Sequence, residues 1–160
     1  MLERRQPSHT IETGRQITMD ELADIKILFV AGFGPIVRDR AASQGLYEKA
    51  LGIRFKEEEG GYLHTESLDG VKSFALWPLD QAAQSCFGQE SWPSDLPLPQ
   101  AWLEFDVDNV ESATAQLESR GYRILIRNKQ EPWSQTVTRL LSPEGLLIGI
   151  TLTPWMRKQT

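Results

Sequence analysis

Two stretches of the chain read as strands: 27–37 is apolar throughout, and 101–107 alternates apolar with polar residues. Each is followed by apolar residues at helical spacing, over 39–52 and 109–121. The Asp and Asn that open these segments suit N-caps, and each segment ends on a glycine, where a helix end favours positive φ. The pattern therefore predicts the same strand–helix unit twice, 70 residues apart.

Three short strand-like runs follow each predicted helix. They cover 54–56, 61–67 and 71–79 in the first half, and 123–127, 136–141 and 146–153 in the second. Turn residues separate the last two runs of each half, with Leu68-Asp69-Gly70 in the first and Ser142-Pro143-Glu144-Gly145 in the second. A single βαβββ unit leaves one sheet face uncovered, so the two units must share a surface. The expected fold class is α+β, built from two βαβββ repeats.

The repeats divide the chain into five segments. We expect an N-terminal extension (1–24), a first unit (25–79), a linker with three prolines (80–100), a second unit (101–156) and a short tail (157–160). The extension lacks the apolar core of a signal peptide. Within it, Thr18-Met19-Asp20-Glu21 has the spacing of a capping box, which predicts either a short helix ending near Ile25 or a charged loop.

Composition narrows the class of protein. The chain has 160 residues, 22 acidic and 17 basic side chains and a net charge of −5, which argues against a nucleic-acid partner. No apolar run approaches the roughly 18 residues of a membrane span, so no membrane partner is expected. A single cysteine, Cys86, cannot form a disulfide within the chain and suits a reducing compartment. We therefore expect a globular protein of the cytoplasm.

Three phrases occur in a fixed order along the two repeats: VRD…LYEKALGIRF, FDVDNVESATAQLESRGYRI and EPWSQTVTRLLSPEGLL. With the 70-residue offset, they make the chain resemble the vicinal oxygen chelate superfamily, which includes glyoxalase I, extradiol dioxygenases and the fosfomycin- and bleomycin-resistance proteins. The resemblance covers about 25–154. It implies that the repeats form a curved mixed sheet around a cleft, with the helices outside, and that the protein is a homodimer.

The resemblance also implies four metal-binding positions, which the catalytic members fill with His and Glu. Three of them are Gly32, Trp102 and Gly149 here, and the fourth lies between 73 and 77. The stretch 71–79 contains no His, Asp, Glu or Cys. Because a divalent ion needs several anionic or imidazole donors, we expect no metal and no cofactor. The chain is then most similar to the metal-free bleomycin-resistance branch.

Strand alternation indicates which side chains face the cleft. On the strand 101–107, every second residue from Trp102 points there, and Trp77 and two glycines do so from other strands, while two further tryptophans frame the opening. The predicted ligand-binding residues are Trp77, Trp92, Trp102, Trp133, Glu104, Asp106, Gly32 and Gly149. Aromatic walls suit planar organic molecules, and the two carboxylates suit a cationic group on the ligand. No residue is predicted to be catalytic.

The leading hypothesis is a metal-independent protein that sequesters a small aromatic or cationic, antibiotic-like molecule. One alternative is structural: the indoles fill a lost metal site as core, and Glu104 forms a salt bridge with Arg139 or Arg123. Another is a metal-dependent glyoxalase-type lyase, isomerase or dioxygenase, with Glu104, Asp106 and His64 as ligands. A third is an interaction module or structural dimer whose own side chains fill the cleft.

Three further polar features are expected to be structural. His64 reads as a hydrogen-bonded strand residue, and Glu57-Glu58-Glu59 reads as a solvated turn. Cys86 has no base near it in the sequence, so it reads as an idle thiol.

Overall fold

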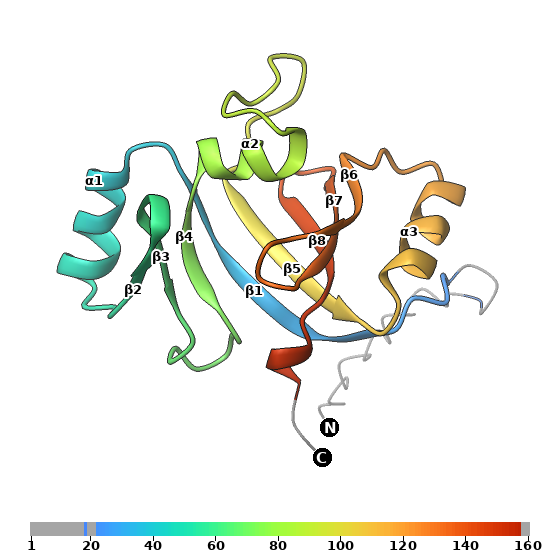
Figure 1. Cartoon of the computed structure of the whole chain (residues 1–160), viewed down its shortest axis with the longest axis horizontal. Helices are drawn as coiled ribbons and strands as arrows, with labels where there is room; N and C mark the ends of the chain where they lie inside the picture. The colour runs from blue at the N-terminus through green and yellow to red at the C-terminus, as the bar shows by residue number, and fades with distance from the viewer. Residues whose placement is uncertain (1–17, 19–21, 158–160) are drawn as a thin grey trace, which may run out of the picture.

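The computed structural model describes Thr18 and residues 22–157. Its strands are β1 (Ile27–Val37), β2 (Lys56–Glu58), β3 (Tyr62–Thr65), β4 (Phe74–Pro78), β5 (Ala101–Val107), β6 (Ile126–Gln130), β7 (Thr136–Leu141) and β8 (Leu147–Leu152). They form one sheet in the order β2-β3-β4-β1-β5-β8-β7-β6 (Figure 1). The central strands β1 and β5 are antiparallel, and each pairs in parallel with the last strand of its own unit. The prediction of an α+β fold with two βαβββ repeats is confirmed.

The helix of each repeat begins at the predicted cap. In the first repeat, α1 (Arg40–Gln44) runs on into a π-helical segment, η2 (Gly45–Ala50), and in the second the helix is α3 (Val110–Ser119). The Asp39 carboxylate accepts a hydrogen bond from the Ala42 N–H at 3.0 Å, and the Asn109 side chain accepts one from the Ser112 N–H at 2.9 Å. Each cap satisfies one of the N–H groups that a first helical turn leaves without a backbone partner.

The segment between the repeats is not simply a linker. It opens with a helix, α2 (Leu79–Phe87), and only 88–100 lack helix and strand. The sequence does contain the spacing that marks this helix, because Leu79, Ala82, Ala83 and Cys86 recur at helical intervals. The other difference concerns the predicted capping box: its residues 19–21 lie outside the described residues, and 22–26 contain no helix.

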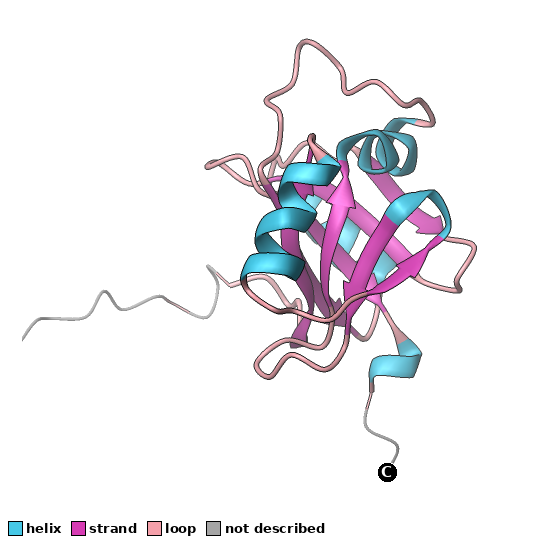
Figure 2. Ribbon diagram, turned by 90° about the vertical axis from the view of Figure 1, so that its left-hand side faces the viewer, coloured by secondary structure: helices cyan, strands magenta, loops and turns pink. Residues whose placement is uncertain are grey.

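The two faces of the sheet have different cores. Beneath η2 and α3, the outer face packs two apolar clusters, which contain Val37, Leu63, Phe74 and Leu76 on one side and Val107, Val110, Ala113, Leu140 and Ile150 on the other. Viewed from the α1 end, this first helix lies on the outer side of the strands (Figure 2). The inner face packs Ile36, Ala75, Trp77, Trp102 and Leu147 against Ala82 and Cys86 of α2.

Two short 3-10 turns complete the described chain, η3 (Glu59–Gly61) and η4 (Pro154–Met156). Among the described helices, none has both the length and the apolar character that crossing a membrane requires.

Gly34 allows β1 to lie close to β4. A Cβ added there would lie 1.9 Å from the Ala75 carbonyl oxygen, whereas one added to Gly45 would meet nothing within 4 Å. We expect Gly34→Ala to lower the free energy of unfolding by about 1–3 kcal/mol through overpacking. Gly45 has helical φ and ψ, so Gly45→Ala should raise it by about 0.5–1 kcal/mol. Urea denaturation followed by circular dichroism measures both. Equal stability of the two variants would contradict the strand spacing.

Candidate functional site

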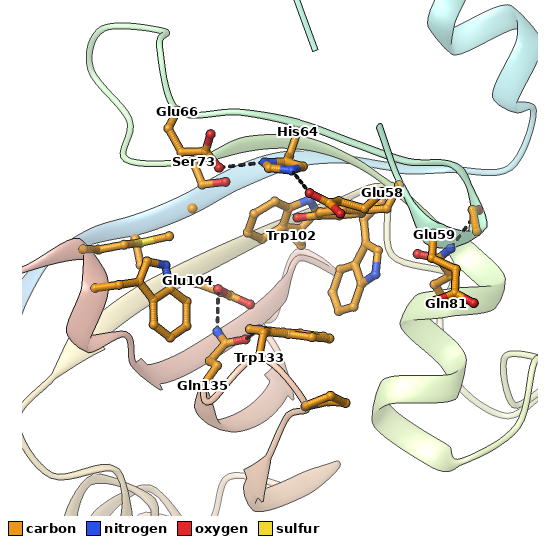
Figure 3. A pocket seen from close by; sticks show the side chains of 18 of the residues that line it. Glu58, Glu59, His64, Glu66, Ser73, Gln81, Trp102, Glu104, Trp133 and Gln135 are labelled. Carbon is orange, nitrogen blue, oxygen red and sulfur yellow. Dashed lines mark hydrogen bonds and ion pairs between the residues drawn. The ribbon is translucent and has the colours of Figure 1, made fainter. Parts of the chain in front are cut away.

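A cavity of about 830 Å³ opens on the inner face of the sheet. This volume is typical of sites for drug-sized molecules. Both repeats line it, together with α2, η4 and the loop before β7. Five of the predicted ligand-binding residues lie in its wall: Gly32, Trp77, Trp102, Glu104 and Trp133 (Figure 3). Alternation along the strands therefore placed Trp77, Trp102 and Glu104 on the correct face, and Trp133 reaches the cavity from a loop.

Trp77 and Trp102 are both buried in the core and exposed to the cavity only at their edges. Their rings meet edge to face, with centroids 6.0 Å apart and planes at 80°. The Trp102 Nε1–H donates to the Ala75 carbonyl oxygen at 3.2 Å. A Cβ on Gly32 would lie 2.4 Å from the Trp102 ring, so the room that this glycine leaves is taken by the indole. The two tryptophans thus serve as core and as cavity wall at once.

A buried ion pair forms the floor of the cavity. The Arg139 Nη1–H group donates to Glu104 Oε1 at 2.9 Å, and the guanidinium carbon lies 4.6 Å from the centroid of the Trp77 ring. Glu104 has the partner that one of the structural alternatives predicted. A Cβ on Gly149 would lie 2.7 Å from Glu104 Cγ and 3.3 Å from Arg139 Nη1. Gly149 therefore gives room to the ion pair, which occupies the space that was predicted to admit a ligand.

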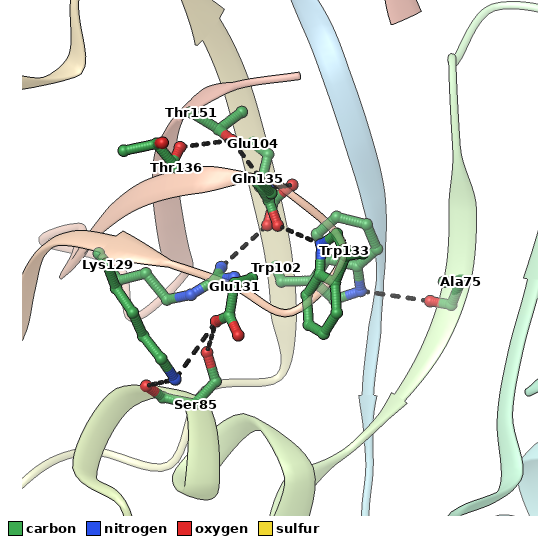
Figure 4. A network of polar contacts seen from close by, with 11 residues as sticks. Ala75, Ser85, Trp102, Glu104, Lys129, Glu131, Trp133, Gln135, Thr136 and Thr151 are labelled. Atoms are coloured by element: carbon green, nitrogen blue, oxygen red, sulfur yellow. Dashed lines mark hydrogen bonds and ion pairs between the residues drawn. The ribbon is translucent and has the colours of Figure 1, made fainter. Parts of the chain in front are cut away.

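Gln135 connects this floor to the mouth of the cavity (Figure 4). Its amide N–H groups donate to Glu104 Oε2 at 2.9 Å and to Thr151 Oγ1 at 2.8 Å. Its amide oxygen accepts from the Trp133 Nε1–H at 2.9 Å. Trp133 is 54% exposed, yet its indole is oriented by a buried residue. Both carboxylate oxygens of Glu104 consequently have partners, so Glu104 is not a free anion for a ligand.

Three predicted ligand-binding residues do not line the cavity: Gly149, which makes room for the ion pair, Asp106 and Trp92. Asp106 is fully buried and accepts hydrogen bonds from the Thr153 N–H at 2.8 Å, the Thr153 hydroxyl at 2.6 Å and Arg157 Nη2 at 2.8 Å. Trp92 packs on Phe87 with ring centroids 5.0 Å apart, and its Nε1–H donates to a backbone carbonyl. The prediction that Asp106 and Trp92 face the cavity was wrong, because other contacts hold these side chains elsewhere.

The rim of the cavity carries a polar group that the sequence did not indicate. His64 lies between Glu66, at 2.6 Å from Nδ1, and Glu58, at 3.0 Å from Nε2. Figure 3 shows these three side chains across the cavity from Glu104, Gln135 and Trp133. Glu59 also lines the rim. The pairing of β2 with β3 brings the predicted solvated turn to the cavity, which local sequence does not specify.

Tyr62 and the η4 residues Trp155 and Met156 are further wall residues that the sequence analysis missed. The Tyr62 ring stacks on His64 with centroids 5.6 Å apart and planes at 21°. Burial raises the pKa of the Tyr62 phenol far above its ordinary value, and the Glu104 carboxylate adds to this shift. The phenol therefore keeps its proton throughout the neutral range. The signal for Tyr62 was its period-2 relation to His64 on one strand.

The sequence profile of the Glyoxalase/Bleomycin resistance protein/Dioxygenase superfamily matches residues 32–150. The chain belongs to this superfamily. No curated protein matches the sequence significantly.

Several solved structures resemble the chain in fold. One is described as an NAD-dependent benzaldehyde dehydrogenase from Legionella pneumophila: 14% identity, TM-score 0.53, covering 76% of this chain and 96% of that one. A second is a glyoxalase/bleomycin resistance protein/dioxygenase superfamily member from Vibrio splendidus: 15% identity, TM-score 0.50, 81% and 99% covered. A methylmalonyl-CoA epimerase from Streptomyces coelicolor has 13% identity and a TM-score of 0.49, with 84% and 100% covered. At such identities the likeness concerns the fold alone.

Strand register now locates the superfamily's four metal positions. Phe33 pairs with Phe74 in the first unit, as Leu103 pairs with Ile148 in the second. Phe74 is therefore equivalent to Ile148, and the next residues along the two strands, Ala75 and Gly149, are equivalent to each other. Ala75 thus occupies the fourth metal position. The four positions hold glycine, alanine, tryptophan and glycine, none of which has a side-chain donor that a divalent ion accepts. The residues present do not fit the metal of the catalytic members.

The alternative ligand set, Glu104, Asp106 and His64, is not assembled either. Glu104 pairs with Arg139, Asp106 binds Arg157 and a backbone N–H, and His64 contacts two other carboxylates. Within the described part of the chain, no group of three or more His, Cys, Asp or Glu side chains could hold a metal ion.

We expect the buried ion pair of the floor to contribute more to the free energy of unfolding than an exposed ion pair does. Glu104→Gln leaves the Arg139 charge buried without a counter-charge, so we expect the free energy of unfolding to fall by about 3–5 kcal/mol. The matched control is Glu118→Gln, which breaks the exposed pair with Arg127 and should cost at most about 1 kcal/mol. Denaturant titration of both variants tests this, and equal losses would show that the floor pair contributes no more than a surface pair.

Cys86 should be unreactive while the protein is folded. Burial raises the pKa of its thiol from the ordinary 9.0 to about 11. Since the thiolate is the nucleophile, a disulfide reagent at pH 8 should modify Cys86 only after unfolding. The folded pKa exceeds the unfolded one, so this group's contribution to stability is complete below about pH 9 and is lost as the pH rises through 11. Rapid modification of the folded protein at pH 8 would refute this assignment.

Proposed function

We propose that the chain binds a small organic molecule that combines an aromatic ring with a cationic group, and that it does so without a metal ion. The observation that carries this proposal is the composition of the cavity, in which indole walls meet a rim with an excess of carboxylates. In this mode of action the chain is similar to the bleomycin-resistance proteins of its superfamily, which sequester a compound and do not transform it.

The aromatic walls support the first half of the proposal. Two indoles are buried in the wall, and two more, Trp133 and Trp155, lie at the cavity with 54% and 52% of their surfaces exposed. Half-exposed indoles lose little conformational freedom when a ring packs on them, and the contact removes a large apolar area from water. A planar ligand that enters between the two repeats would therefore be held mainly by tryptophan.

The charges of the rim support the proposal that the ligand carries a cationic group. The cavity wall contains four carboxylates and one guanidinium, and Glu104 is already balanced by Arg139. Of the remaining three, Glu66 lies 3.7 Å from Lys56. Glu59 has no ion pair within the described residues, and Glu58 contacts only His64. A cation on the ligand would therefore lie at the rim, near Glu58 and Glu59, and not on the floor where the sequence analysis placed it.

The lack of metal-ligating side chains at the superfamily's metal positions supports the proposal that binding needs no metal ion. The superfamily's metal positions carry no ligating side chain here, and the buried carboxylates that could replace them are neutralised by arginines. Binding should thus be insensitive to a chelator. Elemental analysis of protein purified without chelators gives the complementary measurement, and a stoichiometric transition metal would overturn this half of the proposal.

Titration of tryptophan fluorescence with N,N-diethyl-4-phenylbutylamine, an aromatic cation at neutral pH, tests the proposal. We expect a saturable change that excess EDTA does not alter, and weaker binding of the uncharged 4-phenylbutan-1-ol. Glu58→Gln/Glu59→Gln should weaken binding of the amine about twofold to tenfold, the effect of two partly exposed charge pairs. The control Glu57→Gln, on the same strand but outside the cavity wall, should bind as the parent does. No fluorescence change with this or other aromatic cations would refute the proposal.

A further inference from the structure

The guanidinium of Arg139 has donors that the protein does not use. Arg139 lines the cavity and is only 1% exposed. Its Nη1 donates to Glu104, but its Nε is buried and has no hydrogen-bond partner among the described residues. A buried N–H group without an acceptor is unfavourable, and native proteins leave few of them. The guanidinium therefore keeps a donor without an acceptor in a residue of the cavity wall.

The Tyr62 hydroxyl is a second donor at the same end of the cavity. Tyr62 lines the wall and lies within electrostatic influence of both Glu104 and Arg139. Its ring is fixed by stacking on His64, and within the described chain its hydroxyl takes part in no hydrogen bond. Because burial raises the pKa of the phenol, the hydroxyl remains a donor at neutral pH.

The charge balance of the floor decides which acceptor fits. Glu104 already compensates Arg139 at 2.9 Å. A carboxylate on the ligand would add a second anion beside Glu104 with no second cation on the floor, and burial of an unbalanced charge is strongly unfavourable. A neutral carbonyl oxygen accepts the same hydrogen bonds without this cost.

We propose that Arg139 and Tyr62 donate hydrogen bonds to a neutral carbonyl oxygen of the ligand. This inference rests on the proposed function and specifies its ligand class: an amide, ester or ketone at the floor, an aromatic ring between the indoles, and a cationic group at the carboxylate rim. The carbonyl is the element that distinguishes this class from aromatic cations in general.

Two probes of equal length distinguish a preference for ligands with a carbonyl group from binding of aromatic cations in general. N-[2-(diethylamino)ethyl]benzamide carries ring, carbonyl and cation, and N,N-diethyl-4-phenylbutylamine replaces its amide by two methylene groups. We expect the benzamide to bind the parent protein roughly threefold to tenfold more tightly, the range of a net hydrogen bond or two. Calorimetric titration measures both dissociation constants. The indole N–H resonances of the tryptophans show whether both probes occupy the same cavity.

Conservative variants assign the effect to its donors. Tyr62→Phe removes only the hydroxyl, and Arg139→Lys keeps the charge beside Glu104 but loses the Nε donor. Each should reduce the ratio of the benzamide affinity to the phenylbutylamine affinity at least twofold. Since the Tyr62 hydroxyl has no hydrogen-bond partner among the described residues, Tyr62→Phe should also unfold at the same denaturant concentration as the parent. The control is Tyr122→Phe, half exposed and outside the cavity wall.

The outcomes distinguish this inference from the function on which it rests. Equal affinity of the parent for both probes, with both weakened by Glu58→Gln/Glu59→Gln, would overturn the carbonyl site and leave the proposed function intact. An unchanged benzamide advantage in both donor variants would likewise refute the assignment to Arg139 and Tyr62. Failure of both probes to bind the parent would overturn the proposed function and the carbonyl site together.

Discussion

The ion pair between Glu104 and Arg139 fixes the floor on which the rest of the cavity depends. Its members come from β5 and β7, the Trp77 ring of the other repeat covers the guanidinium, and Gln135 carries the constraint outward to Trp133. A buried pair is stable only while each charge keeps its partner, so the surrounding residues cannot vary independently. The apolar walls, the neutral floor and the position of the mouth all follow from this one contact.

The sequence predicted the fold well because periodicity is a local property. The spacing of apolar residues identified both repeats, and Asp39 and Asn109 cap their helices as expected. β2 and β6 begin two and three residues later than predicted, since short edge strands have weak patterns. α2 was missed although its spacing is present: its fully buried residues, Ala82, Ala83, Ser85 and Cys86, are small, and its burial against the inner sheet is a tertiary effect.

The cavity was predicted only where alternation along one strand was sufficient. Trp102 and Glu104 face it as expected, but the same rule included Asp106, whose carboxylate is taken by Thr153 and Arg157 from the end of the chain. The rim could not be predicted, because Glu58 reaches the cavity only through the pairing of β2 with β3. Which partner a carboxylate finds depends on contacts far apart in sequence, and no local pattern encodes them.

The packing around Gly32 and Gly149 leaves little room for a larger residue at either position. A side chain at 149 would meet Glu104 and Arg139, and one at 32 would meet the ring of Trp102. A single substitution at either glycine would therefore disrupt a buried contact. An engineer who wished to install a metal ligand at either position would have to change Trp102 or the Glu104–Arg139 pair at the same time.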